Sequence, residues 1–174
     1  MKRRRLVLVG GGHAHLALIH QAPRLASLGI EIVLIDPQPT LYYSGMMPSV
    51  LGGDVAERAA TISPAQLARE KRVTYVASGA NRIDPVGSSV ELDDGTSITW
   101  DLLSTAIGST VPVPFPVDDD TRSRMVGVKP VGELGRLIKQ IAAQPDRGRG
   151  RGMRVAVIGG GPSAVEIAAN LRAR

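Results

Sequence analysis

Three consecutive glycines near the start of the chain have the spacing of a turn that binds phosphate groups. Gly10-Gly11-Gly12 follows residues 6–9, an apolar run typical of a buried strand, and precedes a segment predicted to be helical. Gly10, the first glycine of the motif, permits a tight turn. Gly12, the second, lets the backbone approach a pyrophosphate, to which the helix N-terminus presents free N–H groups. The pattern predicts a dinucleotide-binding turn formed by Gly10, Gly12, His13, Ala14 and His15.

An acidic residue stands where such a turn requires one. Asp36 ends the second predicted strand, residues 30–35, in the place where a carboxylate accepts hydrogen bonds from ribose hydroxyls. His15 occupies the third motif position, which normally holds a small residue, so we expect a slightly displaced helix or a side chain turned toward the loop. A tight turn without a ligand is the alternative, and the order strand, turn, helix, strand, acid favours the nucleotide site.

The histidines do not have the spacing of a metal site. His13 and His15 are two residues apart, and such residues point to different sides of a helix. His20 does not complete a ligand set, and the chain has no cysteine. We therefore predict no metal and interpret His13 and His15 as capping or packing residues near a cofactor.

A second glycine turn near the end of the chain repeats the first pattern. Residues 155–158 are predicted as a buried strand, Gly159-Gly160-Gly161 as a turn and residues 163–172 as a helix. The fit is better here, because Ala164 is small and Pro162 suits the first turn of a helix. We expect this unit to be incomplete, since the strand that would choose between NAD and NADP does not follow. Its candidate nucleotide-binding residues are Gly159, Gly161, Pro162, Ser163, Ala164 and Glu166.

The intervening sequence predicts further alternation of strands and helices. Asp93-Asp94-Gly95, flanked by residues 90–92 and 97–100, is a strong hairpin signal, and Ser63 followed by Pro64 is typical of a helix start. In chain order, the expected elements are a helix at 13–28 weakened by Pro23, a long functional loop at 37–53, a helix from 64 to 70, a strand at 73–76, a hairpin at 90–100, a strand at 102–107 and a helix at 131–143.

Composition limits the chemistry that the chain itself supplies. With no cysteine, a disulfide and a redox-active dithiol are excluded, so redox chemistry must come from a bound cofactor. No segment predicts a signal peptide or a membrane span, and we expect a cytoplasmic protein. The net charge of +5 includes an Arg-Gly alternation at 147–152, but no stacking aromatics interleave it, so we predict a solvated linker and no nucleic-acid partner.

Together these motifs resemble the FAD-dependent pyridine-nucleotide oxidoreductases of the glutathione-reductase-like fold, on the type II NADH dehydrogenase side. The resemblance is strongest to the flavoprotein module sometimes fused to selenophosphate synthase. The Gly-Gly-Gly-His-x-His turn of that module stands here at 10–15, and its Tyr-Ser-Gly-Met-x-Pro loop stands at 43–48. The strand that ends beside FAD in the family resembles 101–108, with Ile107 in place of the usual threonine. The resemblance covers nearly the whole chain but only roughly the first half of the family's length.

The resemblance implies two cofactors, FAD and NAD(P)H, with hydride passing to FAD and electrons passing on to a small-molecule acceptor such as a quinone. It implies that residues 42–48 pack on or near the isoalloxazine ring, the alternative being an apolar lid without a chemical role. No catalytic residue and no oligomeric state are assigned. The resemblance adds the candidate cofactor-binding residues Tyr43, Ser44, Gly45, Met46, Pro48, Ala106 and Gly108.

The predicted fold class is α/β: a Rossmann-like FAD-binding domain with a parallel sheet and a small antiparallel hairpin, followed by an incomplete second Rossmann-like NAD(P)-binding unit. We expect residues 1–112 to form the N-terminal part of the FAD-binding domain, 113–124 a linker and 125–174 the start of the NAD(P)H-binding domain. Two complete doubly wound domains need about twice the present length. A non-catalytic FAD- or nucleotide-binding fragment is therefore the alternative, while a methyltransferase fits only the first glycine turn.

Overall fold

The computed structural model of the chain describes residues 3–143 and 153–174, which form two compact units. One unit consists of Met1–Leu41 and Ile62–Gly108, and the other consists of Tyr42–Thr61 and Ser109–Arg174. Neither unit is continuous in sequence, whereas the predicted domains are. The assignment of those domains to FAD and NAD(P)H stays a prediction, and the Arg-Gly segment at 147–152 lies outside the described residues.

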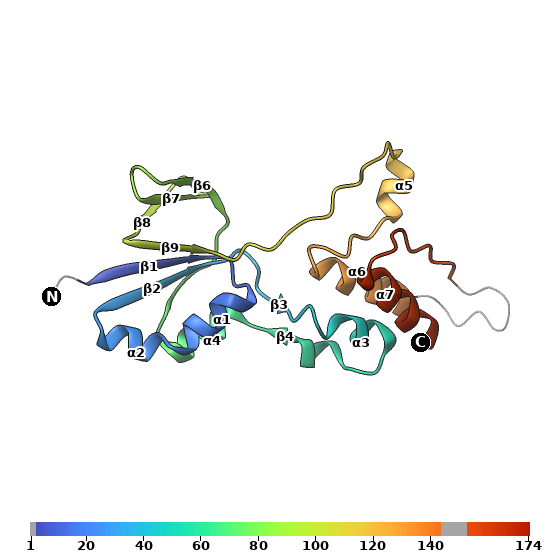
Figure 1. Cartoon of the computed structure of the whole chain (residues 1–174), viewed down its shortest axis with the longest axis horizontal. Coiled ribbons are helices and arrows are strands. Elements are labelled where there is room, and N and C mark those ends of the chain that lie inside the picture. The colour runs from blue at the N-terminus through green and yellow to red at the C-terminus, as the bar shows by residue number, and fades with distance from the viewer. Residues whose placement is uncertain (1–2, 144–152) are drawn as a thin grey trace. The chain divides into compact units, whose positions relative to one another are not determined.

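The first unit is built on a parallel sheet with the strand order β5-β2-β1-β9 (Figure 1). All three recorded pairings are parallel, so the four strands end at the same edge. In the register, Val9 at the end of β1 lies opposite Ile35 of β2 on one side and Thr105 of β9 on the other. The bounds are Arg4–Val9 for β1, Ile30–Ile35 for β2, Thr74–Val76 for β5 and Leu102–Thr105 for β9.

Both faces of this sheet are buried, which explains the unbroken apolar runs in its central strands. Along β1, Leu8 packs toward one apolar cluster and Val7 toward another, as the two-residue period of a strand requires. Helices α1, α2 and α4 cover one face, and the small antiparallel sheet β6-β7-β8 covers the other (Figure 1). The helices span His13–His20, Ala22–Ser27 and Pro64–Lys71, and the strands span Ala80–Asp84, Ser89–Leu92 and Ser97–Thr99.

Most elements predicted for this unit are confirmed. The hairpin is formed by β7 and β8, and Ser63 caps α4 by accepting a hydrogen bond from the Gln66 N–H at 3.3 Å. The single helix expected at 13–28 is divided, because α1 ends at His20 and Pro23 lies in the first turn of α2. Strand β6 was not predicted, since three of its five residues are exposed and give no apolar signal.

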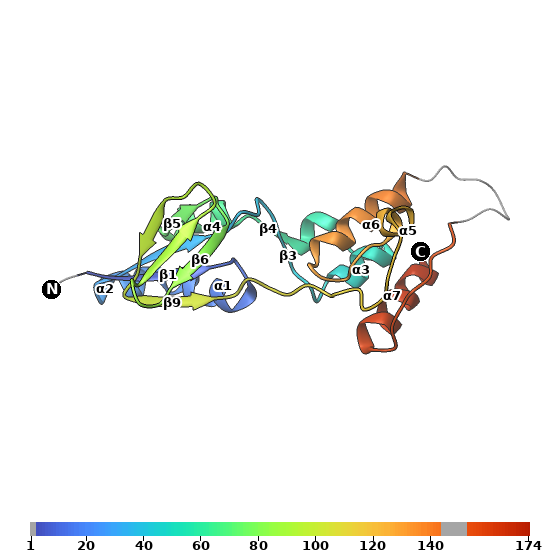
Figure 2. The ribbon, with the colours of Figure 1, turned by 90° about the horizontal axis from the view of Figure 1, so that it is seen from above.

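The second unit is mainly helical around one apolar cluster. Helices α3, α6 and α7 are neighbours in it (Figure 2), and the buried residues of the cluster are Met47, Val50, Leu51, Ala60, Leu134, Leu137, Ile138 and Ile167. The bounds are Met47–Gly52 for α3, Glu57–Ala60 for the 3-10 helix η1, Asp119–Arg124 for α5, Gly132–Ala142 for α6 and Pro162–Ala173 for α7.

The loop expected at 37–53 is wrong in its second half. After the short strand β3 (Leu41–Tyr42), which pairs with β4 (Thr61–Ile62), the chain forms helix α3. Met47, Val50 and Leu51 recur at helical spacing and are buried, so packing overrides the turn-forming composition of the segment. Gly53 ends the helix with a φ of +90°, a left-handed conformation that favours glycine.

The strand expected at 155–158 is also wrong, because the structure assigns no strand there. Val155 is 43% exposed and Ile158 is 73% exposed. A strand that is apolar on both faces needs neighbours to hydrogen-bond its edges and cover its side chains. The described residues of the second unit supply no strand beside this segment, and only the helix that follows it, α7, is formed.

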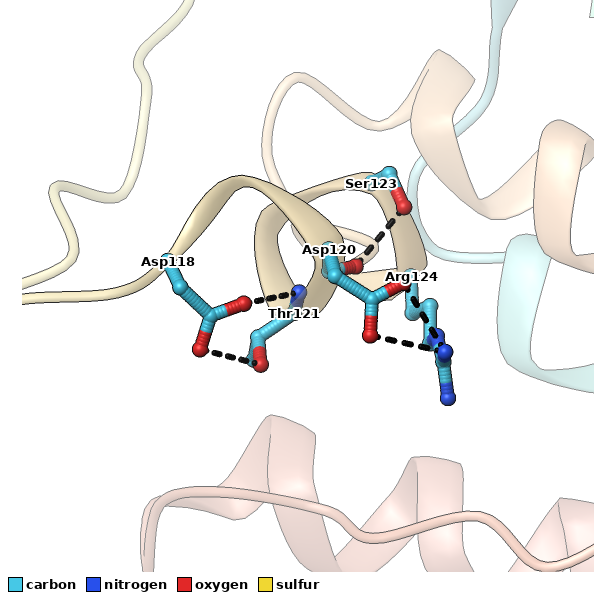
Figure 3. A network of polar contacts seen from close by, with 5 residues as sticks. All are labelled: Asp118, Asp120, Thr121, Ser123 and Arg124. Carbon is cyan, nitrogen blue, oxygen red and sulfur yellow. Dashed lines mark hydrogen bonds and ion pairs between the residues drawn. The ribbon is translucent and has the colours of Figure 1, made fainter.

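The linker expected at 113–124 contains the short helix α5 (Figure 3). Asp118 caps it, because its carboxylate accepts from the Thr121 N–H at 2.7 Å and from the Thr121 hydroxyl at 3.0 Å. The N–H bond of Thr121 is the main cause that lowers the pKa of Asp118 from its usual value. Arg124 pairs with Asp120 at 2.7 Å one turn along, so the helix is held by its own exposed side chains.

Candidate functional site

The carboxyl edge of the parallel sheet brings together three predicted site residues that lie far apart in the sequence. Gly10 follows β1, Asp36 follows β2 and Ala106 follows β9. The Gly10 N–H donates to the carbonyl of Ile35 at 2.8 Å, and the Ala106 N–H donates to the carbonyl of Val9 at 2.8 Å. Because the chain places β2 on one side of β1 and β9 on the other, the glycine turn lies at a topological switch point, where open α/β sheets bind ligands.

The glycine turn approaches the end of β9 so closely that side chains are excluded. A Cβ atom on Gly10 would lie 2.5 Å from the carbonyl oxygen of Ala106, and one on Gly12 would lie 2.6 Å from the same atom. Gly10 also has a φ of +87°, in the left-handed region that glycine adopts without strain. The sequence-based reason for Gly12, a close approach to pyrophosphate, is therefore joined by a second one within the protein itself.

Helix α1 begins at this turn without a side-chain cap. Gly12 is its N-cap residue, no acidic side chain lies in its first turn, and the Gly10 and Gly11 N–H groups already donate to Ile35 and Asp36. Within residues 3–143 and 153–174, the N–H groups of Gly12 and Ala14 have no recorded acceptor. The turn thus presents two backbone donors at the positive end of a helix, a donor set that fits a pyrophosphate.

Asp36 is buried, at 4% exposure, and is held by backbone donors. One carboxylate oxygen accepts from the N–H of Gly11 and the other accepts from the N–H of Gln38 at 2.7 Å. No lysine or arginine of the described chain pairs with it. Each carboxylate oxygen has a second lone pair, so the group retains acceptor capacity for ribose hydroxyls, as its position in the sequence predicts.

Tyr75, which the sequence did not single out, supports the backbone of this acid. Its hydroxyl donates to the backbone carbonyl of Asp36 at 2.9 Å. Burial of the phenol, and secondly the negative charge of Asp36, raise the pKa of Tyr75 above its usual value. A polar tip on an otherwise apolar strand next to β2 is the signal that could have identified it.

His15 lies between the glycine turn and β9, where it is 1% exposed. Its Nδ1 is 2.5 Å from the carbonyl oxygen of Gly10, and its Nε2 is 2.9 Å from the hydroxyl oxygen of Ser104. A polar bridge therefore occupies the place where the motif usually has a small residue. Sequence reasoning missed Ser104, for which the available signal is a hydroxyl inside an apolar strand that pairs with β1. His13 and Ala14 lie in the first turn of α1.

The tyrosine-rich loop predicted to approach the flavin belongs to the second unit. Tyr43, Ser44 and Gly45 are exposed, whereas Pro48 is buried and Met46 packs against the apolar cluster of that unit. The predicted role of Pro48 in cofactor binding also stays a prediction. Contact of the exposed residues with an isoalloxazine ring stays a prediction, and Gly108, at the last position of the first unit, is likewise exposed.

The second glycine motif has its turn and its helix but not its strand. Gly159 has a φ of +127°, Gly161 is the N-cap residue of α7, and the Ala164 N–H donates to the Gly161 carbonyl at 3.0 Å. Pro162 lies in the first turn as predicted, and Ser163 and Glu166 are exposed. Without a sheet edge beneath it, this turn is not assembled as the first one is, and its role in nucleotide binding stays a prediction.

The first unit combines a parallel sheet, a glycine turn and a strand-terminal acid at the switch point, which together define a Rossmann-like dinucleotide-binding fold. The sequence model of the pyridine nucleotide-disulphide oxidoreductase family matches residues 4–174. The chain therefore belongs to this family. Among the residues that the structure describes, no helix is long and apolar enough to cross a membrane.

Several known proteins resemble the chain in sequence or in fold. The chain is 29% identical, over 170 residues, to the ferredoxin–NAD(+) reductase component of the anthranilate 1,2-dioxygenase system of Burkholderia cepacia. That alignment covers 95% of this chain and 39% of the reductase. The water-forming NADH oxidase from Lactobacillus brevis, solved with NADH, matches with a TM-score of 0.78 and 22% identity over 98% of this chain and 37% of the oxidase.

The fold is also similar to that of NDH2 from Plasmodium falciparum, solved in complex with NADH. It matches with a TM-score of 0.68 and 15% identity over 97% of this chain and 37% of that enzyme. The chain thus spans well under half the length of each of these three proteins. The resemblance to the module fused to selenophosphate synthase stays a prediction.

Proposed function

We propose that the chain is the N-terminal portion of a flavoprotein oxidoreductase, comprising an FAD-binding site and the start of an NAD(P)H-binding unit. The observation that supports it best is the joined pair at the sheet edge, in which the Gly11 N–H of the glycine turn donates to the strand-terminal carboxylate of Asp36. Family membership supports FAD and a pyridine nucleotide as the two cofactors.

In this proposal the protein's own residues bind and orient the dinucleotide. The N–H groups of Gly12 and Ala14 donate to the pyrophosphate, and the carboxylate of Asp36 accepts from the ribose hydroxyls. Bound FAD supplies the redox chemistry, taking hydride from NAD(P)H and passing electrons to an acceptor. We propose a small-molecule acceptor, and the similar fold of a sulfide:quinone oxidoreductase from Aquifex aeolicus is compatible with a quinone.

The first test is a titration of the purified chain with FAD, following the quenching of flavin fluorescence, with ADP as competitor. Saturable binding that ADP displaces is the expected result, because the proposed contacts are to the pyrophosphate and the ribose next to adenine. Binding that ADP leaves unchanged would overturn the site assignment, and absence of saturable binding would overturn FAD binding by this chain.

A non-catalytic FAD-binding fragment is the second candidate, and the missing strand at 155–158 favours it. The two candidates differ in turnover. NADH or NADPH oxidation by the FAD-loaded chain, with a soluble quinone as acceptor, distinguishes them. FAD binding without turnover supports the fragment, whereas turnover above that of free FAD supports the oxidoreductase.

A further inference from the structure

The bridge made by His15 connects the glycine turn to a strand that enters the sheet far later in the chain. The ring is almost fully buried, with Nδ1 at 2.5 Å from the Gly10 carbonyl oxygen and Nε2 at 2.9 Å from the Ser104 hydroxyl. Ser104 lies on β9, opposite Leu8 of β1 in the parallel register. The side chain of His15, in α1, therefore ties the glycine turn to β9.

In a neutral imidazole ring only one of the two nitrogens carries a hydrogen, and the chemistry of the two partners decides which one. The carbonyl oxygen of Gly10 can only accept, so Nδ1 of His15 carries the hydrogen and donates. Nε2 is then the acceptor, and the Ser104 hydroxyl donates to it. The bridge is a directed relay in which Ser104 donates to His15 and His15 donates to Gly10.

This relay acts on a carbonyl of the turn and leaves its N–H groups untouched. The Gly10 carbonyl is held toward the imidazole, while the Gly10 and Gly11 N–H groups are occupied by Ile35 and Asp36. The N–H groups of Gly12 and Ala14 are then the donors with no acceptor recorded among residues 3–143 and 153–174. Fixing the Gly10 carbonyl limits rotation of the peptide groups in the turn. It therefore limits the directions in which the N–H groups of Gly12 and Ala14 can point.

We propose that His15, oriented by Ser104, is a positioning residue for the pyrophosphate of the bound dinucleotide. It replaces the small residue of the usual motif by a hydrogen-bonded bridge that sets the distance between α1 and β9 and the orientation of the turn. This inference rests on the proposed FAD site. It assigns to His15 a role through the backbone, without direct contact with the ligand.

The test compares the full 174-residue chain with Ser104→Ala and Ser104→Thr. Ser104→Ala removes only the hydroxyl, so it avoids the large cavity that His15→Ala would leave in the buried site. We expect roughly three- to tenfold weaker binding of FAD and of ADP, the scale of one lost hydrogen bond. Ser104→Thr retains a hydroxyl and is expected to bind FAD and ADP as the parent chain does. The control Ser97→Ala removes an exposed hydroxyl on β8 and is expected to have no effect.

Adenosine separates positioning of the pyrophosphate from general loss of structure. Adenosine has no phosphate, so its binding, followed by shifts of its NMR signals, is expected to be unchanged in Ser104→Ala. Nitrogen-15 NMR of labelled histidine gives a second readout, with hydrogen expected on Nδ1 of His15 in the parent chain and a weakened Nε2 hydrogen bond in the variant.

Each remaining outcome overturns a stated part of the inference. Equal FAD affinity of the parent chain and Ser104→Ala would overturn the positioning role while leaving the proposed function intact. Equal loss of ADP and adenosine binding would show a structural role only. Hydrogen on Nε2 of His15 would contradict the relay. Failure of the parent chain to bind FAD would overturn the proposed function, and the positioning role with it.

Discussion

The backbone N–H of Gly11 donates a hydrogen bond to a carboxylate oxygen of Asp36, joining the first turn of the chain to the end of its second strand. The other carboxylate oxygen accepts from the N–H of Gln38 at 2.7 Å. The acid therefore has two functions in one position. It fixes the turn from within and presents its remaining lone pairs at the edge where the dinucleotide is proposed to bind.

Replacing Asp36 by asparagine tests both functions. An amide has one acceptor oxygen, so its NH2 group would face one of the two backbone donors, and the charge that strengthens both bonds would be lost. Charge-assisted hydrogen bonds contribute about 1.5–3 kcal/mol, so FAD affinity is expected to fall roughly ten- to hundredfold in a fluorescence titration.

Asp93→Asn is the matched control for this substitution. Asp93 also accepts from a backbone N–H, that of Gly79 at 3.1 Å, but it lies in the hairpin turn between β7 and β8 of the same unit. The FAD affinity of the Asp93→Asn variant is expected to equal that of the parent chain. If Asp36→Asn and Asp93→Asn weaken FAD binding alike, the loss reflects general damage and the assignment of Asp36 is wrong.

The close approach of Gly12 to Ala106 predicts a loss of stability that does not depend on FAD. An added Cβ would lie 2.6 Å from the Ala106 carbonyl oxygen, so Gly12→Ala must displace backbone atoms. We expect the free energy of unfolding to fall by about 1–3 kcal/mol, as for other overpacked sites. Urea unfolding without FAD, followed by the fluorescence of the chain's single tryptophan, Trp100 in the first unit, measures it.

Gly160→Ala is the comparison, because a Cβ on Gly160 would meet nothing within 4 Å. Gly160→Ala is expected to leave the urea-unfolding transition, followed by Trp100 fluorescence, unchanged. Equal transitions for Gly12→Ala and the parent chain would contradict the clash. Loss of FAD binding in a Gly12 variant therefore needs this stability measurement beside it before the loss is assigned to the pyrophosphate.

Tyr75 predicts a difference in stability at alkaline pH. Burial, and then the charge of Asp36, raise the pKa of its phenol in the folded state. The folded protein thus retains this proton longer than the unfolded chain, so the stabilisation is complete below the unfolded pKa of about 10 and is lost as pH rises through the folded pKa.

Tyr75→Phe removes this dependence together with the hydrogen bond to the Asp36 carbonyl. At neutral pH the variant is expected to be less stable by about 1 kcal/mol, the usual contribution of one hydrogen bond. The difference should narrow in urea unfolding measured above about pH 10. A constant difference between parent and variant across that range would show that the phenol's proton is not coupled to folding.

The exposed apolar segment before α7 predicts self-association and marginal stability. Val155 and Ile158 are 43% and 73% exposed on a stretch that has no strand partner in the described second unit. Such segments pair with other chains or aggregate. Ile158→Lys is expected to lower the apparent mass in size-exclusion chromatography at high protein concentration.

Val86→Lys is the control for this effect, because Val86 is 97% exposed in a turn of the first unit. It is expected to behave as the parent chain does. A parent chain that elutes as a monomer at every concentration and melts cooperatively would refute the prediction.

Local patterns were sufficient for most of the first unit. The apolar runs at residues 6–9 and 30–35 predicted buried strands. Their side chains divide between two clusters, because a strand directs successive residues to opposite faces. The Ser63 cap and the hairpin turn follow from residues within a few positions of each other, so no distant contact was needed to predict them. The glycine turn belongs to the same group, since tight turning is a property of glycine itself.

Elements that depend on distant partners could not be predicted in this way. Helix α3 forms inside a predicted loop because Met47 and Leu51 are buried against helices that come much later in the chain. The strand expected at 155–158 is absent for the opposite reason, since its apolar sequence requires neighbouring strands and none is described beside it. Residue type alone specifies neither the presence nor the absence of a partner.

The sequence by itself determined the glycine turn, the acid that follows the second strand and the α/β class, because these depend on residue type and short spacing. Only the tertiary structure decided that Gly11 reaches Asp36 and that His15 reaches Ser104, 89 positions away. Strand order places β9 beside β1, and that order is a property of the assembled sheet, in which buried polar groups must find hydrogen-bond partners across the chain.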